Sequence, residues 1–272
     1  MKILLFFLLL PAATFAEESA AHRAIREVDN SLSIGISGTY FDYREPSAGS
    51  LKDKYFDAER GTLSGAGVRA AVSLLRDDVF LFGSFSRSDG NVPYNGHAYL
   101  SFPSIVVPLK ATSHATIDDW NLRAGKGFML SEKWMLILYG SYGYHSWDRH
   151  IQEDSPSGYW EYYSHHVIQY GNRLHYAAGR GTILTLDGRF GLMLAPAISV
   201  PQYGLNRALG RGPVIDIEAE IDQAVAKGLH VFLGGYYTHF NYGQSGEQNG
   251  LIEPVSMTDA YTGLAGVRVS FL

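Results

Sequence analysis

The residues best suited to chemistry in this chain of 272 residues are four acids that follow one another at every second position. Asp216, Glu218, Glu220 and Asp222 alternate with the aliphatic residues of 215–221. Successive side chains of a strand point to opposite faces, so the four carboxylates share one face. A row of carboxylates can bind cations or pair with arginines. The pattern therefore predicts a strand with one acidic and one aliphatic face.

A second candidate is the segment Asp148-Arg149-His150. Its spacing places Asp148 and His150 on the same face of a strand, where the carboxylate can orient the imidazole as a base for water. Histidines and serines are frequent nearby, namely His145, Ser146, Ser164, His165, His166 and His175. Spacing alone assembles no Ser-His-acid triad, because such triads are defined by geometry, and the His-x-x-x-His pattern of a metal site is missing. We predict no metal and no cofactor.

The elements that must position these residues are strands, because period-two alternation recurs along the chain. Apolar residues occupy alternate positions, with small or charged residues between them, in 32–40, 66–74, 120–124, 190–200 and 261–271. A helix would spread such a pattern around its surface and form no apolar stripe. The alternation predicts an all-β protein.

The connections between the strands favour a barrel over a soluble sandwich. Short turns are predicted at 76–78, 131–133, 186–188 and 226–228. Long polar connections are predicted at 44–61, 88–114, 149–159, 204–212 and 243–256. Short and long connections therefore alternate, which is typical of a membrane barrel with both termini on the short-turn side.

The expected fold is an antiparallel transmembrane β-barrel of about ten strands. Eight or twelve strands remain alternatives, because 159–184 is long for one strand and 94–114 has room for another hairpin. Aromatic residues cluster beside the long connections, as an interfacial girdle requires: Tyr40, Phe41, Tyr43, Tyr142, Tyr144, Trp147, Tyr159, Trp160, Tyr162, Tyr163, Tyr236, Tyr237, Phe240 and Tyr242. Trp134 is expected at the opposite interface.

The first sixteen residues have the layout of a secretory signal peptide. Lys2 precedes the apolar run 3–10, and small residues stand at Thr14 and Ala16. We predict a signal peptide at 1–16 and one barrel domain at 17–272. The run is too short to span a bilayer as a helix.

Composition excludes several classes of protein. The chain has no cysteine, which excludes disulfides, thiol nucleophiles and Cys-ligated metal centres. Its formal net charge is −5 and it has no basic run, which argues against a nucleic-acid partner. The thirty glycines and eighteen tyrosines suit strands, turns and interfaces.

The final segment, 266–272, resembles the terminal strand that the outer-membrane insertion machinery recognises, although Phe271 is penultimate and Leu272 is last. With the leader and the alternation, the chain resembles Gram-negative outer-membrane β-barrel proteins. This resemblance implies export, location in the outer membrane, and the insertion machinery and outer-membrane lipid as partners. The strand number is similar to that of the omptin proteases and the Opc-type adhesins, but no family-specific motif is present.

An omptin-like site would need an acidic pair opposite Asp148 and His150. Asp118 and Asp119 are available, but adjacent residues point to opposite faces of a strand, whereas the omptin pattern separates its acids by one residue. A lipid-modifying hydrolase is the other enzymatic alternative, because barrels of that class place a Ser or His on the outer face.

The expected lumen leaves two alternatives open. Arg69, Arg123, Arg173 and Arg268 project from the polar faces of other strands toward the acidic row. They can bridge the carboxylates and close most of the bore, or the acids can line a thin channel that favours cations. We therefore predict a non-enzymatic barrel, either a narrow passive pore or a surface structural and binding barrel, with a small cation or a surface ligand as partner. The alternative is a barrel enzyme.

Overall fold

The computed structural model describes residues 19–46, 55–74, 79–101, 105–152, 158–247 and 252–271. The predicted leader at 1–16 and the predicted turn at 76–78 lie outside these residues. No helix within the described ranges is long and apolar enough to cross a membrane.

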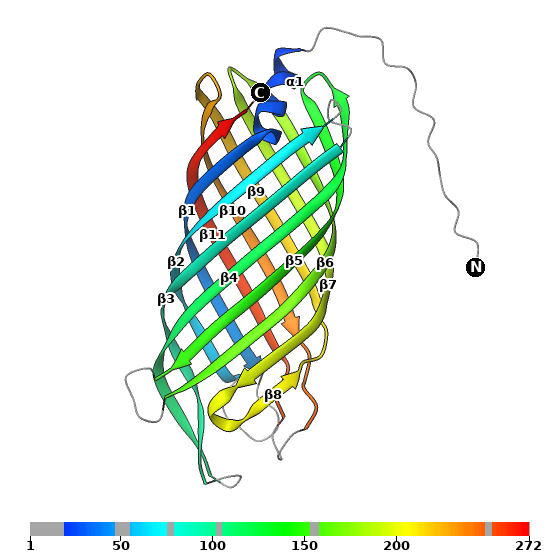
Figure 1. The fold of residues 1–272 in the computed structure, drawn as a ribbon. Coiled ribbons are helices and arrows are strands. Elements are labelled where there is room, and N and C mark those ends of the chain that lie inside the picture. The colour runs from blue at the N-terminus through cyan, green and yellow to red at the C-terminus, as the bar shows by residue number, and fades with distance from the viewer. Residues whose placement is uncertain are drawn as a thin grey trace, which may run out of the picture.

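The fold is a closed antiparallel barrel of ten strands, as the alternation predicts (Figure 1). The ten strands are β1 (Ser31–Pro46), β2 (Tyr55–Leu74), β3 (Val79–Ser101), β4 (Ile105–Ser131), β5 (Trp134–Ile151), β6 (Tyr159–Gly179), β7 (Thr182–Val200), β9 (Pro213–Ala226), β10 (Leu229–Tyr242) and β11 (Ser256–Ser270). Pairing of β1 with β11 closes the ring. A 3-10 turn, η1 (Pro201–Tyr203), and a short strand, β8 (Leu205–Ala208), lie in the connection between β7 and β9.

The stagger of the strands sets the shape of the barrel. The stagger is seen when residues that pair in register are followed from strand to strand around the ring. A path that starts at Ser31 of β1 returns to β1 at Tyr43. Strands of such barrels tilt by about 35–45°. Ten strands enclose an interior that side chains can largely fill, since eight-stranded barrels are only slightly narrower.

The outer face of the barrel is apolar in a band between two aromatic levels. Leu32, Ile34 and Ile36 on β1 are 59%, 58% and 72% exposed, as a lipid-facing surface requires. Trp134 stacks on Tyr176 at the short-turn level, and Tyr144 lies ten residues further along β5. At about 3.3 Å per residue and a tilt of about 40°, that separation corresponds to about 25 Å, the height of the apolar band in such barrels.

The connections agree with the prediction in part. Turns at 132–133 and 227–228 join their strands as expected. The predicted turn at 186–188 is wrong: these residues lie inside β7, and the turn is at 180–181, beside Gly179 and Gly181 with positive φ. The segment 159–179 is one long strand, and 94–114 extends the β3–β4 hairpin and adds none.

A β-bulge in β7 reverses part of the predicted alternation. The register against β6 shifts near Ala195, which has a φ of 47°. An extra residue in one strand moves every later side chain to the other face. Ile198 and Val200 therefore point into the barrel and are buried, whereas the pattern predicts that they share the lipid face of Phe190.

A helix that the alternation did not predict, α1 (Ala20–Asp29), closes the short-turn end of the lumen (Figure 1). Ser19 caps it by accepting a hydrogen bond from the backbone N–H of His22. Ile25 and Val28 are buried against an apolar collar formed by Phe80, Phe82, Met135, Ile137 and Ile183. The apolar face of this short helix is thus buried inside the barrel.

Candidate functional site

The lumen is the candidate site, and its centre holds a network of five arginines and five carboxylates. The network consists of Arg69, Arg123, Arg173, Arg189 and Arg268 with Asp187, Asp216, Glu218, Glu220 and Asp222. Arg69 donates to Glu218 at 2.7 Å and to Glu220 at 3.0 Å. Arg268 donates to Glu220 at 2.7 Å and to Asp222 at 2.5 Å. The structure thus brings the four predicted acids of β9 together with the four predicted arginines.

Asp187 is the carboxylate of this network that sequence reasoning missed. It accepts hydrogen bonds from Arg123 at 2.9 Å, from Arg173 at 2.8 Å and from the hydroxyl of Tyr139. The predicted turn at 186–188 places Asp187 outside the lumen, whereas Arg189 is predicted on the polar face of its strand but not in the charge ladder. The alternation of 183–189 was the available signal, because Asp187 and Arg189 stand on the same face of β7.

Helix α1 is tied to the network at the short-turn end. A carboxylate oxygen of Asp29 lies 3.2 Å from Nε2 of His175. Nε2 of His230 lies 3.4 Å from Glu27, and its Nδ1 lies 2.6 Å from Oδ1 of Asp222. The contacts of Asp29 and Glu27 join the helix to the barrel wall, and the contact of His230 with Asp222 continues into the charge network, so the helix and the network are connected.

Beyond the network, toward the long loops, lies a chamber of about 180 Å³. Its floor includes Arg189, Asp216 and Glu218, and its wall carries the pair Asp119 and His145. Nδ1 of His145 lies 2.7 Å from Oδ1 of Asp119. Each carboxylate oxygen of Asp216 accepts one hydrogen bond, from Gln169 at 2.5 Å and from Thr238 at 2.6 Å.

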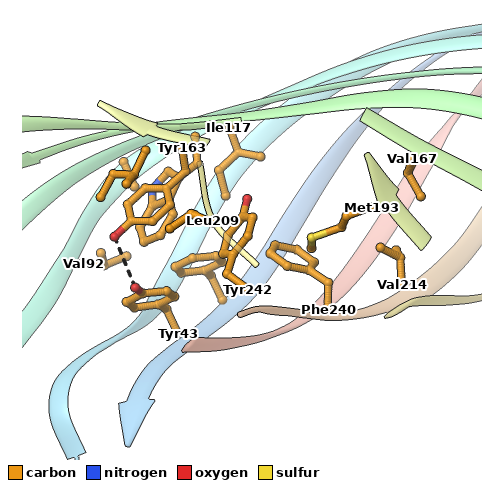
Figure 2. Packing of buried hydrophobic residues seen from close by; sticks show 14 of the residues in the cluster. Tyr43, Val92, Ile117, Tyr163, Val167, Met193, Leu209, Val214, Phe240 and Tyr242 are labelled. Carbon is orange, nitrogen blue, oxygen red and sulfur yellow. Dashed lines mark hydrogen bonds between the residues drawn. The ribbon is translucent and has the colours of Figure 1, made fainter. Parts of the chain in front are cut away.

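An aromatic layer lies on the loop side of the chamber. Figure 2 shows the packing of four of its side chains, Tyr43, Tyr163, Phe240 and Tyr242. The layer contains Phe41, Tyr43, Trp147, Tyr163, Phe240 and Tyr242, each at most 3% exposed. The prediction that these residues belong to an outer girdle is therefore wrong. They occupy the inward positions of their strands, and alternation sends only their neighbours, such as Tyr40, Tyr142 and Tyr144, to the outside.

The last layer lies on the loop side of the aromatic layer and surrounds Arg149 with carboxylates. Arg149 is 1% exposed, donates to Glu59 and Glu161 at 2.7 Å each, and lies against the rings of Tyr43, Tyr94 and Trp147. Tyr43 donates to Glu45 at 2.5 Å, and Tyr163 donates to Glu253 at 2.8 Å. We call Glu45, Asp57, Glu59, Glu161 and Glu253, together with Arg149, the loop-end acidic layer.

Burial dominates the ionisation of this layer. It raises the pKa of Glu161 to about 7, against the attraction of Arg149. Burial also raises the pKa values of Glu45, Asp57, Glu59 and Glu253, and neighbouring carboxylates add to the effect for the three glutamates. Arg149 therefore serves several of these acids, and burial favours the neutral form of their carboxyl groups.

The residues predicted for catalysis are divided between the two faces of the wall. Asp148 and His150 share a face, but it is the outer face of β5, where His150 stacks on Trp160 with ring centroids 3.8 Å apart. Burial and the nearby carboxylate of Asp118 raise the pKa of Asp148. Asp118 also faces outward, 3.7 Å from Arg87, whereas Asp119 faces the chamber.

The histidine and serine cluster does not converge on one point. His145 and His165 face the lumen, and His165 meets the hydroxyl of Tyr242 at 2.9 Å. His166 lies on the outer face with Tyr142, and His175 lies beside α1. Ser146 and Ser164 are paired across β5 and β6 in register. Among the described residues, no group of three or more His, Cys, Asp or Glu side chains is placed to hold a metal ion.

Comparison with known proteins gives the fold. No family model and no curated protein sequence matches the chain. The crystal structure of the outer membrane protease OmpT from Escherichia coli aligns with a TM-score of 0.55 at 9% identity, covering 89% of this chain and 95% of that one. The translocator domain of the autotransporter NalP from Neisseria meningitidis aligns at 0.41 with 14% identity, covering 89% and 88%. The beta domain of the Bordetella autotransporter BrkA aligns at 0.40 with 12% identity, covering 89% and 100%. The likeness to the OmpT structure shows that this chain has the fold of the outer-membrane β-barrels.

Proposed function

We propose that this protein is an outer-membrane barrel without an open path for solutes, acting as a structural and binding element at its loop end. The observation that carries the proposal is the filling of the lumen at successive levels. Helix α1, the paired charge network and the aromatic layer follow one another along the axis. Within the described part of the chain, paired charges and packed rings occupy the lumen at these levels, and on this basis we expect no path for ions.

The loop end supports the second part of the proposal. Strands β3 and β4, with 23 and 27 residues, are the longest of the described strands and pair as far as Ser101 and Ile105. Their hairpin projects beyond the barrel rim on the side opposite α1 (Figure 1). Long external segments on a rigid barrel are suited to binding a surface ligand.

The test is conductance of the refolded protein in a planar bilayer under a salt gradient. We expect a folded, heat-modifiable sample to give no stable current steps. Stable cation-selective steps from the same sample would contradict the proposal, because the acids of β9 would then line an open path.

The charge network offers a sharper version of this test. Asp216→Asn combined with Glu218→Gln removes one carboxylate partner from each of Arg69, Arg123 and Arg189, so we expect a lower free energy of unfolding. Unchanged stability together with new current steps would show that these acids line a channel. Leu32→Ala, on the lipid face, is the control that touches no luminal group.

Location and orientation have a separate test, which uses the absence of cysteine from the chain. We expect a single cysteine at Gln244, at the loop end, to react with an impermeant maleimide on intact cells. A cysteine at Lys227, in a short turn, should react only after the outer membrane is permeabilised. The reverse result would place the loop end inside the cell envelope.

A further inference from the structure

The outer part of the β3–β4 hairpin has a free edge, because β4 extends beyond its neighbour β5. Strand β4 stays paired with β3 over 105–111, whereas its register with β5 ends at Ser113 and Ile151. Gln152 then has a positive φ of 56°, a conformation that ends an extended strand. Within the described residues, no strand pairs with 105–111 on the side of β5.

One hydrogen bond shows which residues of β4 direct their backbone groups toward this edge. The carbonyl oxygen of Thr112 accepts from the backbone N–H of Gln152 at 3.0 Å, so the backbone groups of Thr112 face β5. Successive residues of a strand direct their N–H and C=O groups to alternate edges. The backbone groups of Val106, Pro108 and Lys110 therefore face the free edge.

The opposite strand leads to the same assignment. His97 of β3 is paired with Pro108, and the backbone N–H of His97 donates to Asp57 of β2 at 3.2 Å. This N–H points away from β4, so the two residues form a pair whose backbone groups point outward on both sides. The nitrogen of Pro108 thus lies at the free edge. Because proline has no N–H, the edge lacks a donor at its centre.

The sequence around Pro108 is otherwise suited to strand pairing. The segment 105–109 contains three β-branched residues and a leucine and carries no charge. Short segments of this kind add to other strands when they lie at an exposed edge. Here the edge is interrupted by Pro108 and followed by Lys110, and both side chains are exposed. Proline and lysine are the residues that protect edge strands from pairing.

We propose that Pro108 and Lys110 prevent the free edge of β4 from pairing with the β4 edge of a second copy, so that barrels do not associate through their hairpins. A strand added at this edge would find no donor at position 108 and would have to pack beside a charge at position 110. The inference goes beyond the proposed closed barrel and does not depend on what the loop end binds.

The test is the mass of the refolded full-length mature barrel in detergent, measured by light scattering during size-exclusion chromatography. We expect the wild type to contain one chain. Pro108→Thr combined with Lys110→Thr supplies the missing donor and removes the charge, so we expect the mass of the protein in the particle at least to double.

Pro93→Thr is the matched control. Pro93 lies in the same hairpin, but it is separated from His97 by four residues, so its nitrogen faces β2 and not the free edge. This variant should contain one chain. The proposal is wrong if the folded, heat-modifiable double variant contains one chain, or if the control associates to the same extent. If the double variant does not refold, Pro108→Thr alone decides, and a mass of one chain then overturns the proposal.

Amide hydrogen exchange of the wild type tests the edge directly. We expect fast exchange at Val106 and Lys110, and slower exchange at Val107 and Leu109, whose N–H groups face β3. In the associated double variant, the amides at 106, 108 and 110 should become protected. Protection of Val106 and Lys110 in the wild type would show that the edge is already covered, and this result would overturn the proposal.

Discussion

The charge network and the loop-end acidic layer are two buried clusters of acids and arginines that differ in balance. In the network, five arginines pair with five carboxylates. In the loop-end acidic layer, Arg149 serves several carboxylates, and burial raises their pKa values. The two clusters are similarly buried, so we infer that the ratio of arginines to carboxylates sets the difference between them.

The comparison of the two clusters predicts that substitution of Asp187 causes the largest loss in the free energy of unfolding. The change Asp187→Asn leaves Arg123 and Arg173 buried with a neutral partner. Removing one partner of a buried pair costs about 3–5 kcal/mol, so we expect a loss of that size in the free energy of unfolding, measured in urea. Asp89→Asn, on the outer surface, is the matched control. Equal stability of the two variants would contradict the account of the network.

A smaller effect concerns pH. The pKa of Glu161 is about 7 in the folded protein against an ordinary 4.5. The folded state therefore holds this proton more tightly than the unfolded chain, and the resulting stability is complete below about pH 4.5 and is lost as the pH rises toward 7. We expect a fall on the order of 1–3 kcal/mol in the free energy of unfolding over that range.

The variant Glu161→Gln should remove much of this slope, because an amide does not titrate there. Glu132→Gln, at a short turn on the opposite end, should retain the wild-type slope. A wild-type barrel that gains stability over the same interval would show that the layer is held as anions.

The smallest effect is expected at Glu45. Its pKa is raised well above the ordinary value, chiefly by burial, which favours the neutral carboxyl that an amide resembles. In Glu45→Gln the amide oxygen can still accept the hydrogen bond of Tyr43, and we expect a cost below about 1 kcal/mol in thermal unfolding. A cost as large as that at Asp187 would remove the distinction between the two clusters.

Much of the fold could be predicted because membrane strands have a strict period. The alternation at 32–40 and 215–222 fixes which residues face lipid and which face the lumen, and the structure agrees at both. The prediction failed where one residue changes the phase. The bulge at Ala195 inverts Ile198 and Val200, and nothing in the sequence around it signals a positive φ at an alanine.

The sites were less predictable than the strands. Aromatic residues at 41, 43, 147 and 163 have the composition of a girdle. Whether such a residue faces the lipid or the lumen depends on whether its number in the strand is odd or even, and the closed ring fixes which of the two faces inward. Helix α1 was missed because an isolated helix of ten residues is marginal by itself and is stabilised by the collar that the barrel provides.

The sequence by itself determined that this protein is a barrel of about ten strands with an acidic and basic interior, because the period of two is a property of each strand alone. Only the tertiary structure decided which arginine meets which carboxylate, that Asp119 and His145 face a chamber, and that Asp148 and His150 face outward. These contacts join strands far apart in the chain, and their geometry follows from the stagger and closure of the ring.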